Sequence, residues 1–331
     1  MSGGAGERIG VREVAMRAGV STQTVSRVIN AHPHIRPETR ARVVAAMEDL
    51  GYRVNNAARS LGTATTRTLG ALASDASLYG PSVGIAALEA AAREAQRWVA
   101  TAYADAGDPV AVATAVEHLL LQGVDGIVVV SPHTRTLEIA RSAAAAVRVA
   151  AMHSGGGADR QGEAAALVVG DLVARGHRRF ARLTGPADWS EAAARDGGVS
   201  AALAGAGLPQ GDRWTGDWSA ASGFAAAEEI AATVRIPGGP TAVVVANDQM
   251  ALGLIAGLAA AGLRVPDDVS VAGFDDNPDA AFYRPALTTV RLDLAGEARR
   301  ALAEALAFPD VAAPASPTLI ARASTGAPPT R

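Results

Sequence analysis

Apolar residues near the amino terminus recur at helical spacing in two short segments. Gly19 separates the segments and suits a tight turn, and Ser21 is a typical N-cap for the segment that follows. The pattern therefore predicts two short helices joined by a turn. Their apolar positions are Val14, Ala15, Ala18, Val25, Val28 and Ile29.

The second of these helices has a row of polar side chains opposite its apolar positions. They are Thr22, Gln23, Thr24, Ser26 and Arg27. A helix-turn-helix presents its recognition helix to the major groove of DNA in this way. We therefore expect residues 9–53 to form a helix-turn-helix DNA-binding domain, preceded by a disordered lead-in over residues 1–8.

Two further helices are expected before the pattern changes. Pro37 opens a helical pattern that runs to Leu50. Asn55–Leu61 predicts a short helix of low intrinsic stability, followed by a linker of small and polar residues. We expect residues 54–66 to form this helix and linker, and residues 67–331 to form the rest of the protein.

From Thr68 onward, short apolar strands alternate with longer helical stretches, which predicts parallel sheets with right-handed crossovers. The stretch is longer than one sheet needs. The expected fold class is therefore α/β: an all-α head and a two-lobed, doubly wound body that binds ligands at strand carboxyl ends. The predicted strands are Leu69–Ala73, Val99–Ala104, Gly126–Val130, Arg148–Met152, Arg179–Thr184, Ala242–Ala246 and Val269–Gly273. The predicted helices include Ile85–Arg97, Ala111–Gln122, Ala220–Thr233 and Met250–Ala261.

The charge distribution supports a DNA-binding head. The chain has a net charge of −3. Its first 67 residues hold ten Arg and five acidic residues, which leaves the remainder with a net charge of −8. A basic head on an acidic body suits a protein whose head alone contacts phosphate.

Composition and motifs argue against several other classes. There is no Cys, which excludes disulfides and thiolate chemistry, and the six His lack metal-ligand spacing. No nucleophile elbow, phosphate-binding loop or zinc-protease helix is present, so we expect neither an enzyme nor a cofactor. The start of the chain lacks a signal peptide and no apolar run is long enough to span a bilayer, so a cytoplasmic protein is expected.

Three ordered blocks of sequence resemble the LacI/GalR family of bacterial transcription regulators. The first comprises Val14–Asn30, Thr39–Tyr52 and Asn55–Leu61; the second is Gly176–Pro186; the third comprises Thr241–Gly253, Ser270–Asp276 and Leu287–Thr289. Within the family, Gly216–Phe224 and Val245–Leu254 are most similar to the repressor after which the family is named. The resemblance implies a periplasmic-binding-protein-like body behind the DNA-binding head.

In the head, the resemblance implies that Thr22 and Gln23 read base edges. Gln pairs with adenine through two hydrogen bonds, and Thr contacts a base or a thymine methyl group. The alternative is that the polar residues are merely solvated. Residues placed to contact phosphates or a neighbouring base are Ser21, Thr24, Ser26, Arg27, Asn30, His34 and Thr39.

The hinge of this family binds the minor groove as a pair of helices. The resemblance implies that Leu61 wedges between base steps and that Asn55 and Ala58 line the groove. Leu61 packed on the first strand of the body is the alternative. Val54 stands where many relatives have Pro, which would loosen the entry to the hinge.

In the body, Arg195, Asn247 and Asp275 are the expected polar effector ligands. Asn247 and Asp275 follow predicted strands directly, and an arginine, an amide and a carboxylate together satisfy neighbouring sugar hydroxyls. Trp218 offers an apolar face to a sugar ring. The alternatives are a helix cap for Asn247, a turn former for Asp275, a core side chain for Trp218 and a surface position for Arg195.

The other wall of the expected cleft departs in part from the family. Residues after the first body strand match that wall: Ser74, Leu78, Gly80 and Pro81. His153 stands where the family's namesake has a ligand-binding Asp, the corresponding Arg near Ala106 is absent, and Leu292 replaces a polar pocket residue. The connection Ser154–Gln161 is shorter than in the family and lacks its usual strand.

We therefore expect a homodimeric repressor that binds near-palindromic operator DNA and responds to a small sugar, possibly a galactoside. The absence of leucine heptads after Phe308 favours dimers over tetramers. A purine or another metabolite as effector is the alternative within the family. A sugar-binding protein without a regulatory role is a further alternative, but it would need no DNA-binding head.

Overall fold

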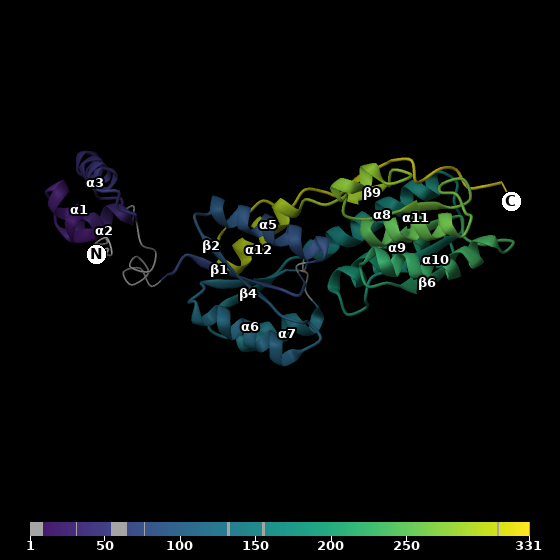
Figure 1. Ribbon diagram of the computed structural model, residues 1–331, viewed down its shortest axis with the longest axis horizontal. Helices are drawn as coiled ribbons and strands as arrows, with labels where there is room; N and C mark the ends of the chain where they lie inside the picture. Colours follow the sequence, from purple (N-terminus) through teal and green to yellow (C-terminus); the bar gives the residue numbers. More distant parts are fainter. Residues whose placement is uncertain are drawn as a thin grey trace, which may run out of the picture. The chain divides into compact units, whose positions relative to one another are not determined.

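The computed structural model describes residues 9–30, 32–53, 65–75, 77–130, 133–153, 156–309 and 311–330 (Figure 1). The chain divides into two compact units, Met1–Arg67 and Thr68–Arg331. We call them the head and the body. The predicted helix Asn55–Leu61 and the lead-in at residues 1–8 lie outside the described residues.

The head contains three helices around a small apolar core. They are α1 (Val11–Ala18), α2 (Thr22–Ile29) and α3 (Pro37–Asp49). Gly19 has a φ of 62°, a left-handed conformation that ends α1 and opens the turn. The Ser21 hydroxyl accepts a hydrogen bond from the Thr24 N–H at 3.1 Å, so the expected N-cap of α2 is present. Val14, Val25 and Val43 are fully buried between the helices.

The first sheet of the body is parallel, with strand order β2-β1-β3-β4. Its strands are β1 (Thr68–Ala73), β2 (Trp98–Tyr103), β3 (Gly126–Val129) and β4 (Arg148–Ala151). Helix α5 (Tyr79–Glu94) covers one face, where Leu69 and Ala71 are buried. Helices α6 (Pro109–Leu121) and α7 (Thr134–Ala143) cover the other, where Leu72 is buried. The successive residues of β1 thus point to opposite buried faces.

The second sheet repeats this arrangement with strand order β6-β5-β7-β8. Its strands are β5 (Phe180–Thr184), β6 (Asp212–Thr215), β7 (Ala242–Val245) and β8 (Ser270–Ala272). The helices are α8 (Gly156–Ala174), α9 (Ser190–Gly205), α10 (Ala220–Arg235) and α11 (Asp248–Ala260), and a 3₁₀ turn, η1 (Pro278–Phe282), follows β8. We call the parts around the first and second sheets the amino-terminal and carboxyl-terminal lobes.

The chain passes between the lobes more than once. After β9 (Thr289–Arg291) in the carboxyl-terminal lobe, helix α12 (Leu294–Leu306) returns to the amino-terminal lobe and packs beside α5 (Figure 1). The chain then forms β10 (Thr318–Ile320), which pairs antiparallel with β9. Neither lobe is therefore a continuous stretch of sequence.

Most of the predicted elements of the body are confirmed, but some bounds and elements differ. Helix α5 begins at Tyr79 rather than Ile85, because Pro81 is accommodated in the first helical turn. Strand β6 was not predicted because it is an exposed edge strand without a buried face. The Pro- and Ala-rich tail contributes β10. In the described residues, no helix is long and apolar enough to cross a membrane.

Candidate functional site

Helix α2 presents a polar surface on the head. Thr22, Gln23, Ser26 and Arg27 are exposed, whereas Val25 and Val28 face the core. The pattern of exposure thus agrees with the prediction of a recognition helix.

The remaining head residues expected at DNA lie around this helix. Thr24 is half-buried and its hydroxyl lies 2.9 Å from that of Ser21. Asn30 ends α2, His34 is exposed in the loop that follows, and Thr39 lies in the first turn of α3. The hinge residues Asn55, Ala58 and Leu61 lie outside the described residues, so their roles stay predictions.

In the body, a cleft lies between residues of both lobes. It has two adjoining hollows, with about 340 and 300 Å³ of empty space. Arg195 and Asp275 line both hollows. The smaller hollow is also lined by Trp218, Asn247, Leu78 and Pro81, and the larger one by His153 and Leu292. Gly80 lines both.

Arg195 is buried at the base of the cleft, which excludes the alternative of a surface arginine. Its Nε donates to Oε1 of Gln161 at 2.7 Å, and its Nη1 donates to the carbonyl of Ala246 at 2.5 Å. Nη2 lies 3.0 Å from Oδ1 of Asp275. The guanidinium plane lies 3.9 Å from the centroid of the Phe274 ring. These contacts fix the arginine in one orientation.

The electrostatics of Asp275 are set by burial and by this arginine. Burial raises the pKa of Asp275 to about 6, while the positive charge of Arg195 lowers it and the negative charge of Glu191 raises it further. At neutral pH the carboxyl group is mainly ionised and pairs with Arg195. The cleft therefore holds an ion pair at the carboxyl end of β8.

Asn247 and Trp218 combine their structural roles with positions in the cleft. Asn247 caps α11, since its Oδ1 accepts from the Met250 N–H at 2.9 Å, and its Nδ2 donates to the Trp218 carbonyl at 3.0 Å. Trp218 is part of the buried core, yet its ring also lines the cleft. Asn247 is therefore a helix cap and Trp218 a core side chain, as the alternatives proposed, and both residues also line the cleft.

Backbone strain is concentrated around the cleft. Of the seven described non-glycine residues with positive φ, four lie in or next to it: His153 at 58°, Trp218 at 76°, Asp275 at 108° and Asp276 at 50°. Such conformations cost on the order of 1–3 kcal/mol each and persist where the surroundings enforce them. Their clustering supports a functional role for this part of the body.

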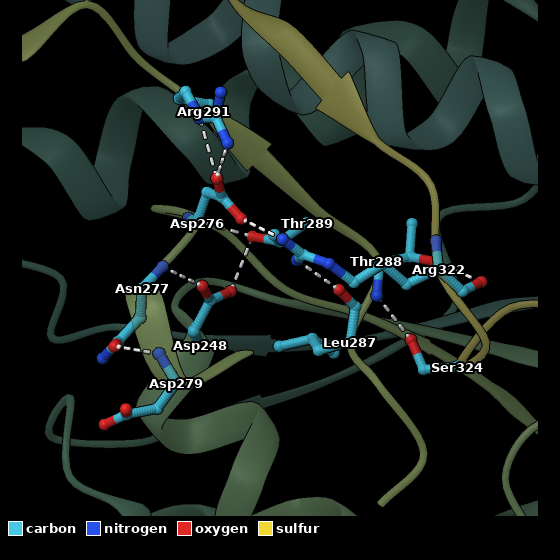
Figure 2. A network of polar contacts seen from close by, with 10 residues as sticks. All are labelled: Asp248, Asp276, Asn277, Asp279, Leu287, Thr288, Thr289, Arg291, Arg322 and Ser324. Carbon is cyan, nitrogen blue, oxygen red and sulfur yellow. Dashed lines mark hydrogen bonds and ion pairs between the residues drawn. The ribbon is translucent and has the colours of Figure 1, made fainter. Parts of the chain in front are cut away.

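Asp248 anchors the loop that carries Asp275 (Figure 2). Its Oδ2 accepts from the Asn277 N–H at 2.7 Å and its Oδ1 accepts from the Thr289 hydroxyl at 2.6 Å. Burial, followed by the negative charge of Asp275, raises the pKa of Asp248 to about 8. Burial and the charge of Asp275 thus both disfavour ionisation of Asp248.

Asp276 fixes the same loop from the other side (Figure 2). It accepts from Arg322 at 2.7 Å and from Arg291 at 2.7 Å. Burial raises the pKa of Asp276, but the hydrogen bonds from the two arginines outweigh burial and bring it below its usual value. Asp248 and Asp276 thus hold the backbone that positions Asp275.

The wall contributed by the amino-terminal lobe agrees only partly with the prediction. Leu78, Gly80 and Pro81 line the cleft. Ser74 is absent from the residues that line its two hollows, as is Ala106, where the family's arginine is missing. Ser74 lies at the carboxyl end of β1, before the loop leading to α5, so the chain reaches the cleft only from Leu78 onward.

Sequence reasoning missed several side chains that line the cleft, among them Tyr79, Trp189 and Glu191, and also the fully buried Gln161, which accepts from Arg195. The rings of Trp189 and Trp218 lie 5.5 Å apart at 65°, in an edge-to-face arrangement. Phe224, the last residue of the matching block Gly216–Phe224, lies on α10 and does not line the cleft. The sequence did contain a signal for Trp189. It lies in the loop between β5 and α9, at the carboxyl end of a strand, where α/β sheets bind ligands.

Comparisons with known proteins match both units. Residues 11–55 match the model of bacterial regulatory proteins of the lacI family, and residues 169–325 match the periplasmic binding protein-like domain. The chain is 35% identical over 297 residues to the lactose operon repressor of Escherichia coli K12, covering 85% of this chain and 79% of the relative. It is 33% identical to the ribose operon repressor of the same organism, with 85% and 87% covered.

Among solved structures, the lac repressor dimer bound to operator and the anti-inducer ONPF superposes with a TM-score of 0.77 at 30% identity. The superposition covers 97% of this chain and all of the other. A helix-turn-helix head joined to a periplasmic-binding-protein-like body defines a DNA-binding transcriptional regulator. The chain belongs to the lacI family of bacterial regulatory proteins.

Proposed function

We propose that this regulator is a cytoplasmic repressor whose binding to a near-palindromic operator is controlled by a small sugar, with a galactoside as the first candidate. The carrying observation is the cleft itself: a buried ion pair of Arg195 and Asp275 lies beside Asn247 and two tryptophan rings. Fixed donors and acceptors next to an apolar ring match the hydroxyls and the apolar face of a sugar.

The tryptophan geometry favours a sugar over a purine. A purine base is recognised by parallel stacking on its two faces, which needs two rings facing each other. Trp189 and Trp218 instead meet edge to face at 65°. One indole face is therefore offered to the ligand rather than a slot between two faces.

A homodimer is supported by the relatives and by exposed apolar side chains. The lac repressor binds operator as a dimer in the structure described above. Here Phe224 on α10 and Leu252 on α11 are exposed, although the two helices pack against each other. Large exposed apolar side chains on adjacent helices are typical of subunit interfaces.

Effector control then follows from a shift between two states of the dimer. A sugar that binds one state more tightly changes the fraction of dimers whose heads engage both halves of the operator. We propose that the sugar favours the state released from DNA, which makes it an inducer.

Two measurements test this proposal. Genomic fragments selected with the purified protein should share a near-palindromic site, and titration calorimetry with galactosides, other sugars and purines should identify the effector class. Heat from a purine alone would contradict a sugar effector.

Arg195→Ala should leave operator affinity intact and abolish release by the effector, because the variant loses the centre of the cleft but no part of the head. Arg141→Ala, an exposed arginine on α7, is the matched control and should respond normally. Operator release in gel-shift titrations is the readout. A normal response of Arg195→Ala would remove this residue from the effector site.

A further inference from the structure

One oxygen of a carboxylate in the cleft is buried and lacks a hydrogen-bond donor among the described residues. Glu191 is 6% exposed and lines both hollows. Its Oε1 is fully buried and accepts no hydrogen bond. Glu191 is the second residue of α9, where the helix dipole favours a negative charge. The side chain is thus a buried anionic group directed at the ligand space.

Arg195, the nearest permanent cation of the cleft, is already engaged. Its guanidinium group faces Gln161, the carbonyl of Ala246 and Asp275. The positive charge is matched by the carboxylate of Asp275. Glu191 is therefore the second negative charge in a cleft that holds one arginine.

His153 is the other basic side chain of the cleft, with Nε2 3.8 Å from Oε1 of Glu191. Its Nδ1 lies 2.9 Å from Nε2 of Gln161, and the Gln161 oxygen accepts from Arg195. Since arginine is only a donor, the Gln161 amide must direct its oxygen to Arg195 and its NH₂ to His153. Nδ1 of His153 is then an acceptor, and its single proton is on Nε2.

This chain of contacts fixes the orientation of the hydrogen bonds around His153. A second proton, on Nδ1, would face the NH₂ group of Gln161, and Gln161 cannot turn without facing Arg195 with the same group. His153 therefore presents its Nε2–H on the side of Glu191, but at 3.8 Å from Oε1 this N–H is too far away to donate a hydrogen bond to it. A buried carboxylate oxygen without a hydrogen-bond donor is costly, so a ligand that supplies a charged donor gains affinity from it.

We infer that the effector is a sugar that carries an ammonium group, which binds the carboxylate of Glu191 while the N–H at Nε2 of His153 donates to a neighbouring hydroxyl. This inference rests on the proposed function, because it assigns the chemical class of the sugar in the same cleft. Sugar acids and sugar phosphates are excluded, since they would meet Glu191 and Asp275 with a like charge. Leu292 adds an apolar wall beside the ammonium site.

Titration calorimetry of the full-length protein near neutral pH tests the assignment. The probes are galactosamine and glucosamine, each compared with its uncharged parent hexose and with its N-acetyl derivative. Because a hydrogen bond to a charged partner is stronger than one between neutral groups, we expect the matching amino sugar to bind about tenfold or more tightly than its parent.

Glu191→Gln keeps the size of the side chain and removes its charge, so it should abolish the preference for the amino sugar over its parent hexose, which is measured as the ratio of the two affinities. Glu138→Gln, at an exposed position of α7, is the matched control and should keep the preference. Thermal unfolding of both variants shows that they are folded. If Glu191→Gln does not fold, the same binding measurements are made on Glu191→Ser instead.

The outcomes separate this inference from the proposed function. If a parent hexose or its N-acetyl derivative binds as tightly as the amino sugar, or if Glu191→Gln keeps the preference, the inference is overturned and a sugar effector stands. If none of the sugars binds or releases the operator, both fall.

Discussion

Arg195 connects separate parts of the body through a single guanidinium group. It binds Gln161 in α8, the carbonyl of Ala246 directly after β7, and Asp275 after β8. Lysine could not replace it, because a single ammonium group lacks the planar fork that reaches several acceptors in fixed directions. One side chain thus joins α8 to the carboxyl ends of β7 and β8 at the cleft.

At the level of the head, Gln23→Ala should relax the base preference at one operator position. The variant loses contacts to one base, so it should lower affinity for the best operator by about 1–3 kcal/mol and leave other sequences less affected. Anisotropy titrations with operators substituted at single positions measure this. Equal losses on all duplexes would contradict a role in base reading.

Arg27→Ala serves as the contrasting variant. Its loss should weaken binding to all sequences alike and reduce the slope of affinity against salt concentration by about one, because one phosphate contact is lost. The same titrations at several salt concentrations provide the comparison.

Effector binding should weaken as the pH falls from 7 to 5. The pKa of Asp275 is raised to about 6, so the ionised carboxylate that pairs with Arg195 is present above this value and is lost below it. Calorimetry across this range with the identified effector measures the change. Asp275→Asn should bind weakly at every pH, and a retained pH dependence in that variant would assign the titration to another group.

Among the elements, α8 and α9 pack closely through facing glycines. A Cβ on Gly198 would lie 2.5 Å from the backbone oxygen of Gly162, whereas a Cβ on the neighbouring Gly197 would meet nothing within 4 Å. Gly198→Ala should therefore force the helices apart and destabilise the body by about 1–3 kcal/mol.

Gly197→Ala is the matched control in the same helix. It should be neutral or stabilising by about 0.4–1 kcal/mol, because alanine loses less backbone entropy on folding. Denaturant unfolding of both variants measures the difference. Equal stability of the two would mean that α8 and α9 do not meet as closely as described.

The elements also show what the sequence could and could not predict. Buried strands such as β7 were predicted because every residue is apolar. Edge strand β6 was missed because its side chains are mostly exposed, so no buried face marks it. Arg195, Asn247 and Asp275 were predicted from strand ends and family resemblance. Glu191 was not, because its role depends on contacts between α8, α9 and β4 that no local pattern records.

At the scale of the whole molecule, operator and effector should affect each other's affinity by the same factor. If the effector lowers the affinity for operator by a given factor, operator must lower the affinity for effector equally, because both act through one equilibrium. Titrating the full-length protein with effector, with and without saturating operator duplex, tests this. Unequal factors would show that the two ligands do not share one two-state equilibrium.

The return of α12 to the amino-terminal lobe links a late segment of the chain to the start of the body. Ala298, Ala301 and Leu302 fill the core of that lobe, and the carbonyl of Ala305 approaches so closely that position 126 must be glycine. A premature stop codon shortly after β9 would therefore leave an unfilled core beside β1 and β3, some 200 residues earlier in the chain. For the same reason, the amino-terminal lobe cannot complete its fold on the ribosome until α12 has been synthesised.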